Sequence, residues 1–113
     1  MDTQKIDGLT VQLTSERNSP GVGETLFRAR ITEEDGRPLA GAKVDLPYFM
    51  VYEKFPAEPE HYVRVAQARE IREGSYEARI PLEKPGMWKI SVRIRHDKKP
   101  PVVATFTVKI SST

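Results

Sequence analysis

The chain has 113 residues, a formal net charge of +2 and 38% apolar residues, which suit one domain with a modest core. It has no run of about 18 apolar residues, so no part of this sequence is expected to cross a bilayer as a helix. Without Cys it forms no disulfide, thiolate metal site or cysteine nucleophile. The weak positive charge is not a nucleic-acid signature, and we expect no nucleic-acid partner.

Between short ends at residues 1–6 and 111–113, which are expected to fray, apolar and polar residues alternate along most of the chain. This period of two is typical of strands with one buried face. Residues 62–68 form a weaker strand pattern, and residues 65–73 also allow a helical turn. The alternation predicts these inward-facing residues: Leu9, Val11, Leu13, Phe27, Ala29, Ile31, Ala42, Val44, Leu46, Tyr76, Ala78, Ile80, Trp88, Ile90, Val92, Ile94, Ala104, Phe106, Val108 and Ile110.

Turn sequences separate these strands. "DGRP" at 35–38 and "PGMW" at 85–88 combine Gly with Pro, while "REGSY" and "HDKKPP" interrupt the alternation later in the chain. About seven one-sided strands at this spacing predict an all-β fold, an immunoglobulin-like antiparallel β-sandwich. We expect one domain over residues 1–113 with an ordered core at about 8–110.

Two blocks of the sequence carry a family resemblance. The first is the turn "DGRPLAGAKV" at 35–44, and the second is "EGSYEARIPLEKPGMWKISVRI" at 73–94, followed by the strand "VVATFTVKI". The second block, with Gly74, Tyr76, Ala78, Leu82, Gly86 and Trp88, is the more specific. Together the blocks resemble the FixH-like and YtkA-like family of small bacterial domains over residues 8–110.

The resemblance implies a non-enzymatic, extracytoplasmic domain in the periplasm or at the cell surface. Family members are often tethered by one N-terminal membrane helix and are associated with copper or other cation handling, including assembly of copper-containing oxidases. The sequence departs from the family by lacking the anchor, which implies a native protein anchored by a segment absent here. It also has few Met and His residues after the third strand.

Soft and imidazole ligands suggest one candidate metal site. Cu(I) favours thioether and imidazole donors, and Met50, His61 and Met87 are the residues that would supply them. The competing interpretation is that the methionines fill gaps in the packing and that the histidine is an exposed loop residue. We therefore expect no resident cofactor, with copper as the alternative.

Other site chemistries are poorly supported. The acids at 33–35 are expected to form a solvated hairpin tip rather than a Ca²⁺ site. No arrangement of nucleophile, base and acid is recognisable, which predicts that the chain is not an enzyme. The basic residues of strands 25–32 and 88–95 are expected on opposite sheets, with Glu77 pairing with Arg28 or Arg30.

The segment "PYFMVYEKFPAEPEHY" at 47–62 is unusually aromatic for a connection that contains several prolines. Aromatic and Met residues are enriched in the cores of protein interfaces. The segment is therefore a candidate contact for a membrane-associated protein partner, and packing against the sandwich edge is the competing interpretation. The candidate contact residues are Tyr48, Phe49, Met50, Tyr52 and Phe55.

Two functional hypotheses follow. The first is an accessory domain of a membrane-linked copper or cation system, which docks through residues 47–62 and for which metal contact is optional. The second is a structural spacer or adhesion module that belongs to a larger surface or secreted protein and binds no metal.

Overall fold

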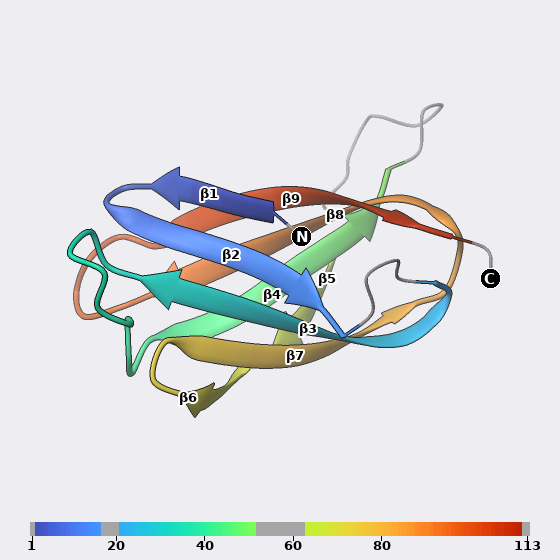
Figure 1. Cartoon of the computed structure of the whole chain (residues 1–113). Helices are drawn as coiled ribbons and strands as arrows, with labels where there is room; N and C mark the ends of the chain where they lie inside the picture. The colour runs from blue at the N-terminus through green and yellow to red at the C-terminus, as the bar shows by residue number, and fades with distance from the viewer. Residues whose placement is uncertain (1, 17–20, 52–62, 112–113) are drawn as a thin grey trace.

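The computed structural model describes residues 2–16, 21–51 and 63–111, in which nine strands form two stacked sheets (Figure 1). This confirms the predicted all-β, immunoglobulin-like sandwich. Within the described ranges, no helix is long and apolar enough to span a membrane. The strands are β1 (Asp2–Ile6), β2 (Leu9–Ser15), β3 (Gly23–Thr32), β4 (Lys43–Met50), β5 (Arg64–Gln67), β6 (Arg69–Arg72), β7 (Ser75–Leu82), β8 (Gly86–Arg95) and β9 (Val102–Ile110).

The five-stranded sheet has the order β1-β2-β3-β7-β6, with antiparallel pairing throughout. Its first strand corrects the expectation that residues 1–6 fray, because Asp2–Ile6 pairs with β2 along its whole length. Ile6 pairs with Leu9 across a two-residue turn of Asp7 and Gly8, whose φ angles are 49° and 80°. Positive φ at both positions matches the twist of a hairpin, and Asp-Gly is a preferred sequence for it.

The four-stranded sheet has the order β5-β4-β8-β9 and lies behind the first sheet in Figure 1. β5 and β6 are separated by one residue, yet β5 pairs with β4 and β6 pairs with β7 in the other sheet. At the crossing, the Ala68 amide donates a hydrogen bond to the Val44 carbonyl at 3.1 Å. The helical turn considered for 65–73 is therefore wrong, because the backbone of this stretch is satisfied by strands of both sheets.

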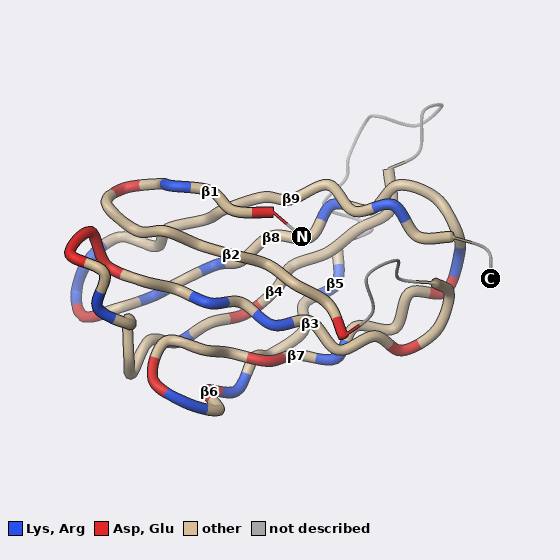
Figure 2. The backbone as a smooth tube through the Cα atoms, viewed as in Figure 1, with Lys and Arg blue, Asp and Glu red and all other residues tan. Residues whose placement is uncertain are grey.

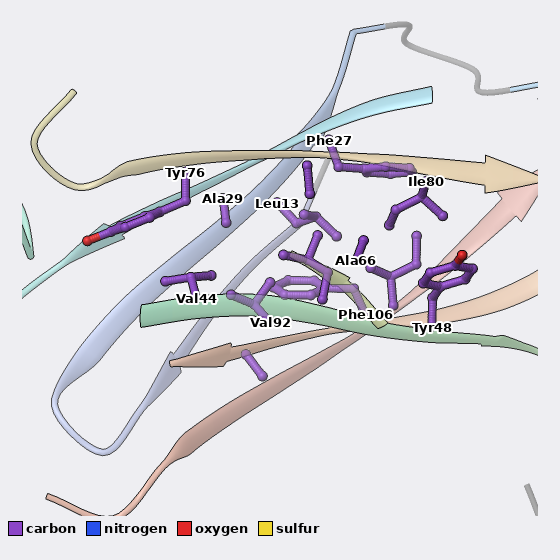
Figure 3. Close-up of a cluster of buried hydrophobic side chains, with 14 of the residues drawn as sticks. Leu13, Phe27, Ala29, Val44, Tyr48, Ala66, Tyr76, Ile80, Val92 and Phe106 are labelled. Atoms are coloured by element: carbon purple, nitrogen blue, oxygen red, sulfur yellow. The ribbon is translucent and has the colours of Figure 1, made fainter. Parts of the chain in front are cut away.

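The predicted inward faces of the two sheets meet in one core (Figure 3). Phe27, Tyr76 and Phe106 are among its largest side chains and are almost completely buried. Trp88 closes one end, and its indole nitrogen donates to the Lys84 carbonyl at 3.0 Å. Each large apolar side chain contributes about 1.5–3 kcal/mol when it is removed from water, so this core supplies most of the driving force for folding.

Tyr76 fastens the loop between β3 and β4 to the core. Its hydroxyl donates to the Leu39 carbonyl at 2.7 Å and accepts from the Ala42 amide at 3.0 Å. Nearby, the Glu70 carboxylate accepts from the Gly41 amide at 3.2 Å. Such hydrogen bonds each contribute about 0.5–1.5 kcal/mol net to stability. Tyr76 of the block at 73–94 thus holds the turn at 35–44 in place, and the role of that turn is architectural.

The outer face of the five-stranded sheet carries two ion pairs between β3 and β7. The Arg28 Nε donates to Glu77 at 3.0 Å, and Arg79 lies 3.7 Å from Glu24, which confirms the predicted pairing of Glu77. Figure 2 shows acidic and basic residues close together along β3 and β7. The basic residues of β3 and β8 lie in different sheets, as predicted.

Candidate functional site

β4 and β8 determine which way the candidate site residues point. Met50 pairs with Trp88, so both side chains leave the sheet toward the core, against which Met50 packs. Met87 precedes Trp88 in β8 and therefore points to the opposite, outer face, where it is 42% exposed. The thioethers of Met50 and Met87 consequently lie on opposite faces of the four-stranded sheet.

This geometry argues against the predicted copper set. Because Met50 and Met87 leave the sheet on opposite faces, they do not form a common ligand pair, and His61 lies outside the described residues. In the described part of the chain, no three His, Asp or Glu side chains group closely enough to hold a metal ion. Strand alternation, rather than separation along the sequence, decides on which face each methionine lies.

The candidate partner residues of β4 also lie on both faces of the four-stranded sheet. Tyr48 is only 5% exposed, and its ring centre lies 6.3 Å from that of Trp88 in a tilted arrangement, so its ring packs in the core rather than on the surface. Met50 also faces inward. Phe49 pairs with Lys89 on the outer face, where it is half-buried. Tyr52 and Phe55 lie outside the described residues.

Phe49 belongs to a larger group of side chains on the outer face of the four-stranded sheet. Val65 on β5 is 45% exposed and pairs with Pro47 on β4. Beyond Phe49, Val51 is 36% exposed, and its amide donates to the Met87 carbonyl at 2.9 Å. We call this group, together with two lysines next to it, the outer patch: Pro47, Phe49, Val51, Val65, Met87, Lys89 and Lys109.

The two lysines lie directly beside the apolar members of the outer patch. Lys89 pairs with Phe49, and Lys109 pairs with Met87 on the neighbouring strand. Side chains in such cross-strand pairs are about 4.5–5.5 Å apart at Cβ. In the part of the chain that the structure describes, neither Lys89 nor Lys109 forms an ion pair. Both ammonium groups therefore remain available to a partner.

The arginines farther along the same face are already engaged. Arg93 holds both carboxylate oxygens of Asp45, at 2.7 and 2.6 Å, and Arg95 adds a contact at 3.1 Å. Asp45 is only 2% exposed although it points to the outer face. Burial alone raises the pKa of Asp45, but the hydrogen bonds and charges of Arg93 and Arg95 outweigh it, and the pKa lies below the ordinary value of 3.8.

A small cavity of about 80 Å³ lies at the end of the sandwich formed by the β1-β2 and β8-β9 turns. Leu39 and Ile94 contribute apolar surface, and Glu33, His96 and Lys99 line it with polar groups. The His96 Nδ1 lies 3.4 Å from the carboxylate of Asp97, the next residue in the chain. The cavity combines opposite charges with no dominant sign, so it does not favour one class of ligand.

Sequence reasoning overlooked most of the outer patch. Val65, Met87 and Lys109 belong to three strands that are distant in sequence, and only the pairing of β4 with β5 and β8, and of β8 with β9, brings them together. A signal was present in the outward positions of each strand, since an apolar residue at such a position departs from the usual alternation. Phe49, Met87 and Val103 are such residues.

The sequence matches one family of known proteins. A sequence model described as YtkA-like matches residues 3–93, which is most of the chain. The chain belongs to the YtkA-like family. This confirms the resemblance drawn from the turn at 35–44 and the block at 73–94. No curated protein sequence matches the chain.

Solved structures share the fold of this YtkA-like domain at low sequence identity. A DUF4426 family protein from Pseudomonas aeruginosa is similar over 100% of this chain and 99% of its own, with a TM-score of 0.67 and 15% identity. The PmoD soluble domain from Methylocystis sp. is similar over 96% of both chains, with a TM-score of 0.65 and 11% identity. In both cases the likeness covers nearly the whole of the solved chain.

The fold also occurs as part of longer chains. A DUF4785 family protein from Legionella pneumophila matches with a TM-score of 0.61 and 9% identity, and the match covers 96% of this chain but 29% of that one. At such identities the likeness establishes the fold alone.

Proposed function

We propose that this YtkA-like domain is a non-enzymatic, extracytoplasmic accessory domain that docks on a membrane-associated protein through the outer patch. The observation that carries the proposal is the outer patch itself. It combines three exposed apolar side chains with two lysines that have no ion pair among the described residues. Exposed apolar groups next to charged ones are typical of interaction surfaces on small soluble domains.

The family supports the compartment and the accessory role. The YtkA-like resemblance implies an extracytoplasmic domain, and a similar sandwich forms the soluble domain of PmoD. A link to copper or another cation would then run through the docked partner, because Met50 and Met87 point to opposite faces. A structural spacer is the second candidate, supported by the similar domain within the longer DUF4785 protein.

Site-specific cross-linking tests the proposal, because the chain has no Cys and each introduced thiol is unique. Val65→Cys and Met87→Cys place a photoactivatable maleimide reagent on the outer patch. Gln12→Cys and Arg30→Cys place it on the outer face of the five-stranded sheet as matched controls. In intact bacteria that produce the protein, we expect the patch variants to cross-link one membrane-associated protein, identified by mass spectrometry.

Two further readouts test the location of the domain and the specificity of cross-linking. For an extracytoplasmic domain, we expect a membrane-impermeant maleimide to label Gln12→Cys in intact cells. A thiol that is labelled only after the cells are lysed would contradict this location. Equal cross-linking from both faces contradicts docking through the outer patch. Cross-links absent from every variant support the spacer function instead.

A further inference from the structure

The two outer faces of the sandwich differ in which side chains lie next to their basic residues. On the five-stranded sheet, Arg28 and Arg79 pair with Glu77 and Glu24. Other outward basic residues there are Lys5, Arg30 and Arg69, and Arg30 lies between the polar side chains of Gln12 and Ser75. On the four-stranded sheet, strand alternation directs five basic side chains and one acidic side chain outward in the described strands. They are Lys43, Lys89, Arg93, Arg95 and Lys109, with Asp45 as the acid.

Asp45 neutralises only the end of this face where Arg93 and Arg95 lie. The other end, at the outer patch, keeps the positive charges of Lys89 and Lys109. There each lysine has an apolar side chain as its cross-strand neighbour, Phe49 for the first and Met87 for the second. A complementary surface must therefore present carboxylates spaced between apolar side chains.

We propose that the outer patch recognises an acidic segment of the partner protein, in which carboxylate and apolar side chains alternate. The proposal rests on the proposed docking function and names the chemistry of the partner. Two lysines on strand faces, Lys89 half-buried and Lys109 exposed, suit single carboxylates, whereas recognition of phosphate groups more often uses the paired donors of Arg. Here the two arginines of the face are already bound to Asp45.

Two other occupants fit less well. In a symmetric pair of copies, this face would meet itself and bring lysines of like charge together. A lipid surface is penetrated by apolar groups that protrude from the protein. The outer patch instead lies on a sheet face, where Phe49 and Pro47 are half-buried among their neighbours.

A peptide titration tests the proposal on the intact chain. The probe is a short peptide in which Glu alternates with Phe or Leu, followed by amide NMR, and its matched control replaces each Glu by Gln. We expect saturable shifts at Phe49, Val65, Met87 and Lys109, with affinity about five- to tenfold higher for the Glu peptide. High salt should reduce this difference because Lys109 is exposed and Lys89 is only half-buried.

Charge reversal provides a sharper readout. The double variant Lys89→Glu, Lys109→Glu is expected to lose the preference for the Glu peptide and to favour the same peptide with Lys in place of Glu. Arg30→Glu on the opposite face is the matched control and should behave like the parent chain.

Several results overturn the inference. These are absence of saturable shifts up to millimolar peptide, equal binding of the Glu and Gln peptides, or shifts on the five-stranded sheet. Binding to phosphatidylglycerol vesicles but neither to phosphatidylcholine vesicles nor to the peptide would identify a lipid surface instead. If cross-linking from the outer patch occurs in cells but survives the charge-reversed variant, docking stands and its acidic specificity fails.

Discussion

At the scale of single residues, Gly74 shows why the two family blocks belong together. Its φ is +81°, and its carbonyl accepts a hydrogen bond from the Ile31 amide at 2.8 Å. A Cβ at this position would lie 2.6 Å from the Cβ of Pro38 and 2.9 Å from the Ile31 carbonyl oxygen. The turn at 35–44 therefore packs directly on the backbone of the block at 73–94, and only glycine leaves room for it.

Replacing Gly74 by Ala is expected to lower the free energy of unfolding by about 2–4 kcal/mol, since it adds backbone strain to a steric overlap. Gly36→Ala is the matched control, because its φ is +89° and nothing lies within 4 Å of the added Cβ. The control should lose only about 1 kcal/mol. Urea unfolding followed by circular dichroism measures both, and equal losses would exclude the contact with Pro38 as the cause.

Asp45 gives the molecule an acid-sensitive contribution to stability. Because the folded-state pKa lies below 3.8, ionised Asp45 stabilises the fold above that pH, and the contribution disappears as pH falls through the folded-state pKa. Asp45→Asn removes it. We expect the stability advantage of the parent chain over Asp45→Asn to be constant from pH 7 to about 5 and to shrink below about pH 4. An advantage that does not change down to pH 2 in urea titrations would contradict this.

At the scale of secondary structure, β1 covers one strand edge and links the two sheets. It pairs with β2 over its whole length, and the side chain of Gln4 donates to the Thr105 carbonyl on β9 in the other sheet. In Figure 1, β1 runs beside β9 along one side of the sandwich. β1 therefore covers the edge of β2 and joins the two sheets, although few of its side chains are buried.

A chain that starts at Leu9 is expected to fold but to be less stable by about 1–2 kcal/mol, because little more than Ile6 is lost from the apolar contacts. It should also self-associate, since an uncovered strand edge pairs with other chains. Thermal unfolding and light scattering test the two expectations separately. A truncated chain as stable and as monomeric as the parent would show that β1 has no protective role.

At the scale of the whole molecule, the core and the outer patch are separable. The core is formed by the inward positions of both sheets, whereas Lys89 and Lys109 point outward from β8 and β9. The same alternation that buries one face leaves the other available for a partner. Changes on the outer patch can therefore alter binding without unfolding the domain.

Lys89→Glu combined with Lys109→Glu is expected to change the free energy of unfolding by less than about 0.5 kcal/mol, because neither lysine has an ion pair in the described part of the chain. Arg93→Glu is the contrasting variant, because it removes the main partner of Asp45 and should cost clearly more. Thermal unfolding compares the three chains. A large loss in the double lysine variant would mean that these residues support the fold itself.

The sequence by itself determined the class of fold and most of the core. Period-two alternation placed residues such as Phe27, Tyr76 and Phe106 inside, because burial of one strand face needs no knowledge of which strand lies beside it. The Gly and Pro turns marked the connections, and the blocks at 35–44 and 73–94 indicated the family.

The tertiary structure decided what depends on pairing between distant strands. It added β1, divided 64–72 between two sheets and placed Met50 and Met87 on opposite faces. It also assembled the outer patch from β4, β5, β8 and β9. The physical reason is that hydrogen bonds between strands fix register and neighbours, and these long-range choices leave little trace in any one strand's pattern.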